Sequence, residues 1–385
     1  MSRNEEQRRA GRLRPRELAI QGAIVFVVVA ALATVVATTL GNLEDRGIEL
    51  GLTFLEDRAG FTIPESILAY TPDDTNVRAI LVGIGNTLYV TTVVAALSTI
   101  LGALIGVGRI SPEPVLAAAA RFWVDVTRNV PPILLLIFLY SLLGAMLPAD
   151  RAAAPGLGVL ASQRGIAIPV PALPDGAGWM LVATVVGWLA FALLTRRWRD
   201  ARVRRLILRR IVPAALLLGL LALFILRAPA AAMRWPAAEG ADLTDGLILS
   251  PEFVSLVVGL TFYTSGFIAE IVRAGLQAVA RGQWEAAAAL GLGRRHVLRL
   301  VVFPQMIRVI LPAMTSQFIN VLKNSTLVIA VGFTDFLVVM GTIINRTSHA
   351  VEGTAIIVSV YLTISLSFSA VMARVDRRLR LASTR

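Results

Sequence analysis

Long apolar runs, separated by short polar and charged stretches, follow one another along most of the chain. The hydrocarbon core of a bilayer is about 30 Å thick, and a helix needs roughly 20 apolar residues to cross it. The pattern therefore predicts an all-α integral membrane protein with about eight transmembrane helices, of which the fourth and fifth are the shortest. The predicted helices are 18–40, 80–107, 122–147, 178–195, 211–227, 252–275, 307–333 and 354–373.

Composition agrees with this pattern. Apolar residues make up 56% of the 385 positions and charged residues 16%, which is too little polar surface for an ordinary soluble enzyme. The chain has no cysteine, so disulfides, a thiolate metal site and a cysteine nucleophile are excluded. With only two histidines, a multi-histidine metal centre is not expected either.

The distribution of charge predicts the orientation in the membrane. The net charge is +12, but the basic residues cluster at the ends of apolar segments, which argues against a nucleic-acid-binding surface. Alternate connections, beginning with the N-terminal tail, carry 28 basic and 9 acidic residues, whereas the remaining connections carry 8 and 16. Because Lys and Arg are enriched on the cytoplasmic side, both termini are predicted to lie in the cytoplasm.

Three stretches outside the regular spans allow more than one interpretation. Segment 18–40 follows an Arg-rich tail, as a signal peptide would, but its apolar run is long and we expect an uncleaved helix. The acidic connection 41–79 is predicted to be a solvated loop, the alternative being a docking surface for an external partner. Pro- and Gly-rich loops at 148–178 and 228–251 flank the fourth and fifth helices, which indicates an inserted helix pair.

A short helix is predicted between the sixth and seventh spans. Glu285 is followed by four alanines, the residues with the highest helix propensity, and a carboxylate suits the positive N-terminal end of a helix. Gly291 or Gly293 can end the helix. Such a slim helix can enter a groove of another protein, with Glu285 making a charge-assisted contact. A helix lying on lipid would instead need large apolar residues and many cations.

This segment resembles the EAA loop of ABC importer permeases. Val301 and Phe303 replace the usual Ile and Leu and keep the positions hydrophobic. In that family the loop is the coupling helix that docks on a separate ATPase subunit. The resemblance therefore assigns ATPase coupling to Glu285, Ala286, Ala287 and Gly291. The matching residues are Glu285, Ala286, Ala287, Gly291, Val301, Phe303 and Pro304.

Further stretches are similar to the polar amino-acid (histidine/glutamine-type) permeases of that family, so the resemblance covers nearly the whole chain. It implies a five-helix type I ABC importer permease core over about 80–147 and 252–373, with an extra N-terminal helix and the inserted pair. The implied domains are 1–79, 80–375 with inserted helices at about 149–250, and a tail at 376–385. The similar stretches are 85–92, 101–106, 125–132, 267–275 and 323–327.

With its extra first helix and inserted helix pair, the chain resembles one longer branch of this family, the general L-amino-acid and glutamate/glutamine/aspartate/asparagine permease subunits. The resemblance implies a multi-pass subunit of the bacterial inner membrane that translocates polar L-amino acids. Its implied partners are a second permease, usually a paralogue, two copies of a cytoplasmic ATPase, a periplasmic amino-acid-binding protein and the lipid bilayer. The chain contains no G-x-x-x-x-G-K-[ST] loop, so ATP must be used by the partner ATPase.

Polar residues within the apolar spans are candidates for a translocation pathway. Lys323 is the only lysine and lies inside the seventh segment, where a charge normally faces a cavity or a partner. It is predicted to contact substrate or gate, or else to form a structural link to Glu270 or a helix-end carbonyl. The other candidates more often make interhelical hydrogen bonds. These are Asn324, Ser325, Thr326, Asn86 and Thr87.

Packing and alternative functions complete the sequence-based picture. Gly102 and Gly106 form a small-xxx-small pair, which predicts close helix packing. An ion-coupled secondary amino-acid transporter is the alternative function, but it would favour inverted repeats and paired intramembrane carboxylates, which are not apparent. An intramembrane protease would need a Ser–His pair or two Asp residues at membrane depth. Copurification of an ATPase would separate these classes.

Overall fold

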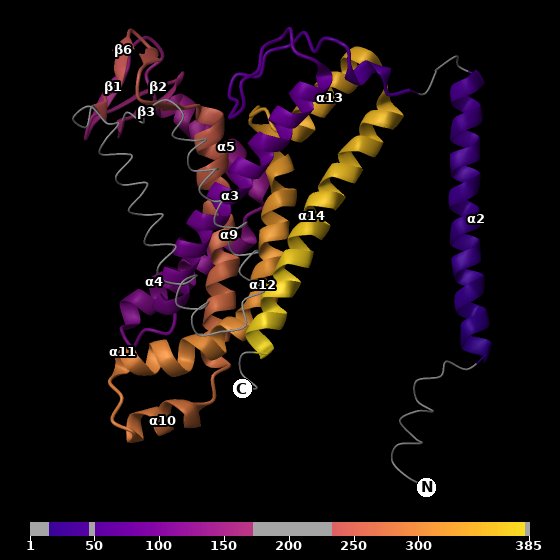
Figure 1. Cartoon of the computed structure of the whole chain (residues 1–385). Coiled ribbons are helices and arrows are strands. Elements are labelled where there is room, and N and C mark those ends of the chain that lie inside the picture. The colour runs from indigo at the N-terminus through magenta and orange to yellow at the C-terminus, as the bar shows by residue number, and fades with distance from the viewer. Residues whose placement is uncertain (1–14, 46–50, 172–232, 382–385) are drawn as a thin grey trace, which may run out of the picture.

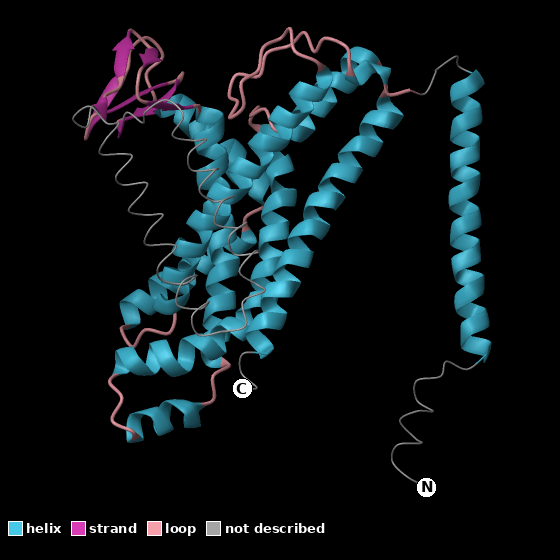
Figure 2. Ribbon diagram, in the orientation of Figure 1, coloured by secondary structure: helices cyan, strands magenta, loops and turns pink. Residues whose placement is uncertain are grey.

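A computed structural model describes residues 15–45, 51–171 and 233–381. Within these residues, four helices are long and apolar enough to cross a membrane, and a sharply bent pair brings the number to five (Figures 1 and 2). The predicted segments 178–195 and 211–227 lie outside the described residues. Helix α2 (Pro15–Asp45) coincides with the first predicted segment. The count of eight therefore stays a prediction, whereas the mostly helical membrane fold is confirmed.

Two helices far apart in the sequence form the centre of the bundle. They are α3 (Asn76–Gly108) and α9 (Pro251–Gln277), which pack along much of their length. A Cβ atom at Gly102 would lie 2.8 Å from the Ser265 carbonyl oxygen, and one at Gly106 would lie 2.6 Å from that of Ala269. Only glycine allows two helix backbones to approach this closely. The predicted close packing at this pair of glycines is confirmed.

The third predicted span, 122–147, is wrong as a single helix. The structure has α4 (Pro114–Asn129) followed by α5 (Pro132–Met146), and the two are bent by 102°. Val130 between them is extended, at φ −91° and ψ 125°. Proline offers no backbone N–H and disfavours helical geometry in the preceding residue, so Pro131 and Pro132 end one helix and begin the next.

The seventh span is longer than predicted. Helix begins at Arg294 rather than at 307 and continues to Ala330, before the predicted end at 333. The helix consists of four segments. Its first turns carry charged residues, so the apolar pattern that predicted the span does not include them. The π-helical segment lies directly before Pro304, which cannot donate a backbone hydrogen bond. The segments are α11 (Arg294–His296), η4 (Val297–Val302), α12 (Phe303–Asn324) and η5 (Ser325–Ala330).

At the end of the bundle nearest to residues 51–75, which we call the cap end, the chain is more ordered than predicted. The connection after η5 contains the short apolar helix α13 (Phe336–Thr347), followed by α14 (Ala350–Leu381). Phe54, in the 3₁₀ turn η1 (Thr53–Leu55), is buried and stacks on His349 with ring centroids 4.7 Å apart. In the described part of the predicted solvated loop, no acidic side chain is buried, whereas Phe54, Ala59 and Ile63 anchor the loop to α13.

The same end carries a small β structure, so the all-α prediction is wrong here (Figure 2). Strand order in the main antiparallel sheet is β1-β2-β3-β8, and two further strand pairs, β4–β5 and β6–β7, lie beside it. Strands of two to four residues leave too little alternation to be read from sequence. We call these strands the β cap. They are β1 (Ala153–Gly156), β2 (Val159–Ser162), β3 (Gly165–Ile168), β4 (Val170–Pro171), β5 (Met233–Arg234), β6 (Ala237–Glu239), β7 (Asp242–Thr244) and β8 (Leu247–Leu249).

Pairing of β3 with β8 has a consequence for the predicted insertion at about 149–250. Ala167 pairs with Ile248, so the two ends of the insertion meet in one sheet. Ser162 Oγ also donates a hydrogen bond of 2.8 Å to the carbonyl of Ala241. The strands before and after the inserted segment thus form one unit at the cap end, immediately before α9.

Candidate functional site

Helix α10 (Arg281–Ala289) lies at the end of the bundle opposite the β cap (Figure 1). Its end is a Schellman motif: Leu292 N–H donates to the carbonyl of Ala287 at 3.2 Å, and Gly291 N–H to that of Ala288 at 2.9 Å. Gly291 has φ +71°, which glycine adopts without steric cost. The predicted short helix is confirmed, and of the two glycines that could end it, the structure selects Gly291.

One face of α10 is used by the chain itself. Ala287 is only 3% exposed and packs in a cluster with Val297, Val302 and Met306, which belong to η4 and α12. Gln305 Nε2, on α12, donates to Gln283 Oε1 at 3.2 Å. An alanine fits this position because a larger side chain would hold α10 away from η4.

The remaining alanines of α10 and its carboxylate face outward. Glu285, Ala286, Ala288 and Ala289 are all exposed. Ala287 differs from the other three predicted coupling residues, because helical periodicity turns it toward the bundle. Glu285 and Ala286 are available to a partner, Ala287 attaches the helix and Gly291 ends it.

A charged cluster joins α3 and α9 near the same end. Glu270 accepts hydrogen bonds from Arg109 Nη1 and from Arg273, whose Nε lies 3.1 Å from Glu270 Oε1. All three side chains are largely shielded from solvent. The proposed structural link between Lys323 and Glu270 is therefore wrong, since the carboxylate is already paired with two arginines.

Lys323 is exposed on α12 rather than buried in the described bundle. Among the described residues, the structure records no ion pair for its ammonium group. The neighbouring hydroxyls bond to their own helix: Ser325 Oγ donates to the Leu322 carbonyl at 2.8 Å and Thr326 Oγ1 to that of Lys323 at 2.6 Å. Asn324 is half-buried. A pathway role for these four residues stays a prediction.

Asn86 and Thr87 connect α3 to the cap-end loops. The Asn86 amide donates to the carbonyls of Glu65 and Thr334 at 2.7 and 2.8 Å. Thr87 Oγ1 accepts the backbone N–H of Phe336, at the start of α13, at 3.1 Å. Both are buried, and these hydrogen bonds match the structural interpretation of polar groups in apolar helices. Asn86 also lines a cavity.

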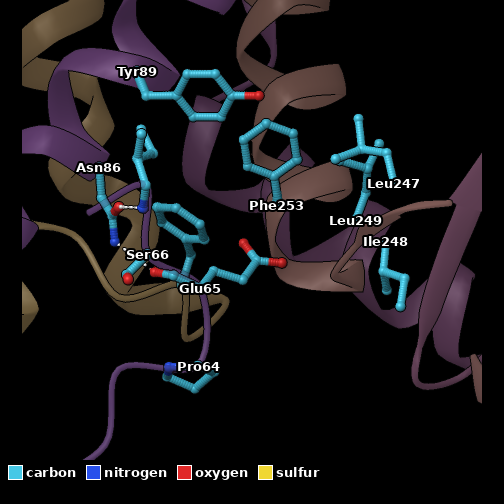
Figure 3. A pocket seen from close by; sticks show the side chains of 11 residues that line it. Pro64, Glu65, Ser66, Asn86, Tyr89, Leu247, Ile248, Leu249 and Phe253 are labelled. Carbon is cyan, nitrogen blue, oxygen red and sulfur yellow. Dashed lines mark hydrogen bonds between the residues drawn. The ribbon is translucent and has the colours of Figure 1, made fainter. Parts of the chain in front are cut away.

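This cavity, of about 420 Å³, lies at the cap end (Figure 3). Glu65 is its only acidic lining residue among those described, and its Oε1 accepts the backbone N–H of Ser250, the N-cap of α9, at 2.7 Å. Burial raises the pKa of Glu65. The lining residues are Pro64, Glu65, Ser66, Ile67, Asn86, Tyr89, Leu247, Ile248, Leu249, Phe253 and Phe333.

Sequence reasoning missed this cavity. Glu65 is one of several acidic residues in its loop, and no local motif distinguishes it from the others. Its position depends on three segments that are distant in the chain: the loop itself, α3, and the β8–α9 junction. Hydrogen bonds from Asn86 to the Glu65 carbonyl and from Ser250 N–H to the Glu65 carboxylate help to place the loop over the cavity.

Asp335 is a second buried carboxyl group that the sequence did not single out. It is 1% exposed, lies in the turn before α13, and its Oδ1 caps that helix by accepting Val338 N–H at 2.9 Å. Burial raises the pKa of Asp335 from 3.8 to about 7. Asp335 Oδ2 and the Tyr361 hydroxyl are both buried, and the two side chains are close enough to interact electrostatically.

Asp335→Asn is expected to stabilise the protein above pH 7. Between pH 3.8 and about 7, Asp335 keeps its proton in the folded wild type but loses it in the unfolded chain. The free energy of unfolding of the wild type therefore falls as pH rises through this range. Asparagine caps a helix as well as aspartate does and carries no charge. We expect the Tm of Asp335→Asn at pH 8 to exceed that of wild type by roughly 5 °C, with a smaller difference at pH 5.

Asp335→Ala is the control, because it removes the charge and the cap together. Loss of the cap costs about 1 kcal/mol, so Asp335→Ala should gain less than Asp335→Asn at pH 8. Thermal unfolding of the purified protein at several pH values measures both variants. A parallel pH dependence for wild type and Asp335→Asn would contradict the assignment.

Comparisons with known proteins place this geometry in a family. Residues 183–381 match the family model described as "Binding-protein-dependent transport system inner membrane component". The chain is 38% identical to the Escherichia coli protein YhdX, a "Putative amino-acid ABC transporter permease protein", over 92% of each chain. It is also 38% identical to the "General L-amino acid transport system permease protein AapQ" of Rhizobium johnstonii, over 94% of this chain and 93% of AapQ.

A third relative points the same way. The "Glutamate/glutamine/aspartate/asparagine transport system permease protein BztB" of Rhodobacter capsulatus is 32% identical over 95% of this chain and 94% of its own. These matches run nearly end to end and include α10 and the bundle around α3 and α9. The chain therefore belongs to the family of binding-protein-dependent transport system inner membrane components.

Proposed function

We propose that this chain is the permease subunit of an ABC importer that moves polar L-amino acids across a bacterial inner membrane, with ATP hydrolysed by a separate subunit. The observation that carries the proposal is the structure of α10. Its carboxylate and three of its alanines face outward, while Ala287 attaches it to the bundle. A slim, exposed and firmly attached helix suits docking of a partner. The three named relatives are all amino-acid permeases.

The contacts of α10 suggest how motion of an ATPase would reach the membrane. Ala287 packs in one cluster with Val279, two residues after the end of α9, and with Met306 of α12. A displacement of α10 therefore acts on two spans at once. Because Gly102 and Gly106 bring α3 against α9, α3 is expected to move with α9 rather than slide along it. The result would be a rearrangement of the bundle around the substrate path.

The finer assignments follow the same scheme. Both termini and α10 are proposed to lie in the cytoplasm, which puts the β cap and the cap-end loops outside. The chain would have eight transmembrane helices, built on a five-helix core. Its partners would be a second, paralogous permease, two ATPase copies and a periplasmic binding protein. The relatives support this importer scheme, and they lend no support to the ion-coupled alternative.

Reconstitution tests the proposal. The chain, coexpressed with a partner permease and an ATPase, is placed in liposomes with the binding protein outside and ATP inside. We expect uptake of labelled L-glutamate or L-glutamine that requires ATP and survives a protonophore. Uptake driven by an ion gradient without ATP would overturn the proposal. Omission of the binding protein is the control and should abolish uptake.

A further inference from the structure

The cap-end cavity combines aromatic walls with one carboxylate. Tyr89 and Phe253 are stacked with ring centroids 5.6 Å apart, and Phe253 lies 5.9 Å from Phe333. Figure 3 shows the Glu65 carboxylate beside Phe253, facing the hydrophobic side chains of β8. None of the eleven described lining residues is basic. The cavity is therefore apolar on most sides and acidic at one point.

Two hydrogen bonds hold Glu65 in place. Its Oε1 accepts the backbone N–H of Ser250, and the Asn86 amide holds the main chain of Glu65 through its carbonyl. Both ends of the residue are thus tied to the bundle, at α9 and at α3. A pre-positioned carboxylate binds a cation with little further loss of side-chain entropy.

The surroundings favour a positive ligand. Aromatic faces attract cations, and a partly buried carboxylate gains most from an opposite charge. A second carboxylate, that of Glu252, lies close enough to act on Glu65 electrostatically, although it does not line the cavity. An anionic group would be repelled by both carboxylates. The size of the cavity, about 420 Å³, lies in the range of small-molecule sites.

We propose that this cavity binds the α-ammonium group of an amino acid, with Glu65 as its counter-charge and Tyr89, Phe253 and Phe333 as its walls. The proposal rests on the proposed function as an amino-acid permease. The cavity would recognise the charged amine that all L-amino acids share, rather than any one side chain. Such recognition suits a permease with several substrates.

Glu65→Gln tests the counter-charge directly. Glutamine keeps an oxygen that can accept the Ser250 N–H, so the loop and α9 stay in contact while the charge is lost. Binding of tritiated L-glutamine is measured on the purified permease–ATPase complex without binding protein. We expect Glu65→Gln to weaken binding by about tenfold or more.

Glu56→Gln is the matched control. It removes an exposed carboxylate of the same loop that lies outside the cavity lining. We expect less than about a threefold effect on binding. Tyr89→Leu, at a half-exposed position, provides a second test of the cavity and should weaken binding without loss of Tm.

Competition identifies which group is recognised. L-Glutaminamide keeps the ammonium group and lacks the carboxylate, whereas glutaramic acid keeps the carboxylate and lacks the ammonium. On wild type we expect L-glutaminamide, but not glutaramic acid, to displace tritiated glutamine. Glu65→Gln should remove this preference, which a merely structural effect on the loop would not do.

The outcomes separate this proposal from the proposed function. Unchanged binding in both Glu65→Gln and Tyr89→Leu, or displacement by glutaramic acid alone, overturns the cavity assignment. Absence of displaceable binding to wild type also overturns it. In each case ATP-dependent uptake by reconstituted wild type would leave the proposed function standing, and only its absence would remove both.

Discussion

Gly106→Leu is expected to leave almost no folded protein. A Cβ at this position would lie 2.6 Å from the Ala269 carbonyl oxygen and 2.9 Å from the Val272 Cβ, so the clash involves backbone of α9 that cannot rotate away. Overpacking in a tight interface costs about 1–3 kcal/mol or more, and here it would push apart the two central helices. We expect loss of the monodisperse peak in size-exclusion chromatography of a fluorescent fusion.

Gly144→Leu is the matched control for this result. Gly144 also lies within a helix, α5, but a Cβ there meets nothing within 4 Å in the described structure. Leucine has the higher helix propensity in both positions, so propensity cannot explain a difference. Normal yield and Tm for Gly106→Leu would show that α3 and α9 do not pack as the structure has them.

Glu285→Lys is expected to abolish ATP-dependent uptake while the protein still folds. Glu285 is exposed on α10 and makes no contact that the bundle needs, so the reversal of charge acts on a partner. Loss of a charge-assisted contact, together with the repulsion that replaces it, is expected to lower affinity for the ATPase by about a hundredfold. Pull-down of the ATPase with the tagged permease and uptake in liposomes measure the two effects.

Glu113→Lys serves as the control, because Glu113 is another exposed carboxylate before a helix, outside α10. It should keep ATPase binding and uptake. Wild-type uptake by Glu285→Lys would count heavily against the coupling role of α10.

Ala287→Trp separates docking from attachment. Ala287 is buried in the chain's own cluster, so a bulky residue is expected to detach α10 and to destabilise the protein as well as to abolish uptake. The sequence alone predicts the same phenotype for Glu285 and Ala287. The structure predicts different ones, with a loss of Tm only for Ala287→Trp.

Much of the fold could be predicted from the local pattern of apolar and polar residues. The errors of this prediction have local causes as well. Helices α3, α9 and α14 fall on predicted apolar runs because the length of a run decides whether it spans a bilayer. Pro131 and Pro132 mark a kink or a helix start in the sequence, and α5 begins at Pro132, but hydropathy does not give the angle of 102° between the two helices. The β cap was not predicted because its strands are too short to give a periodic pattern of apolar and polar residues.

By itself, the sequence determined the membrane class, the short alanine-rich helix and the family resemblance, because each depends on neighbouring residues: apolar length, alanine propensity and motif spacing. Only the tertiary structure decided that Ala287 turns inward, that Glu270 pairs with two arginines, and that Glu65 reaches Ser250. These contacts join residues brought together by packing of distant helices, and no local pattern of apolar and polar positions records which distant partner a side chain meets.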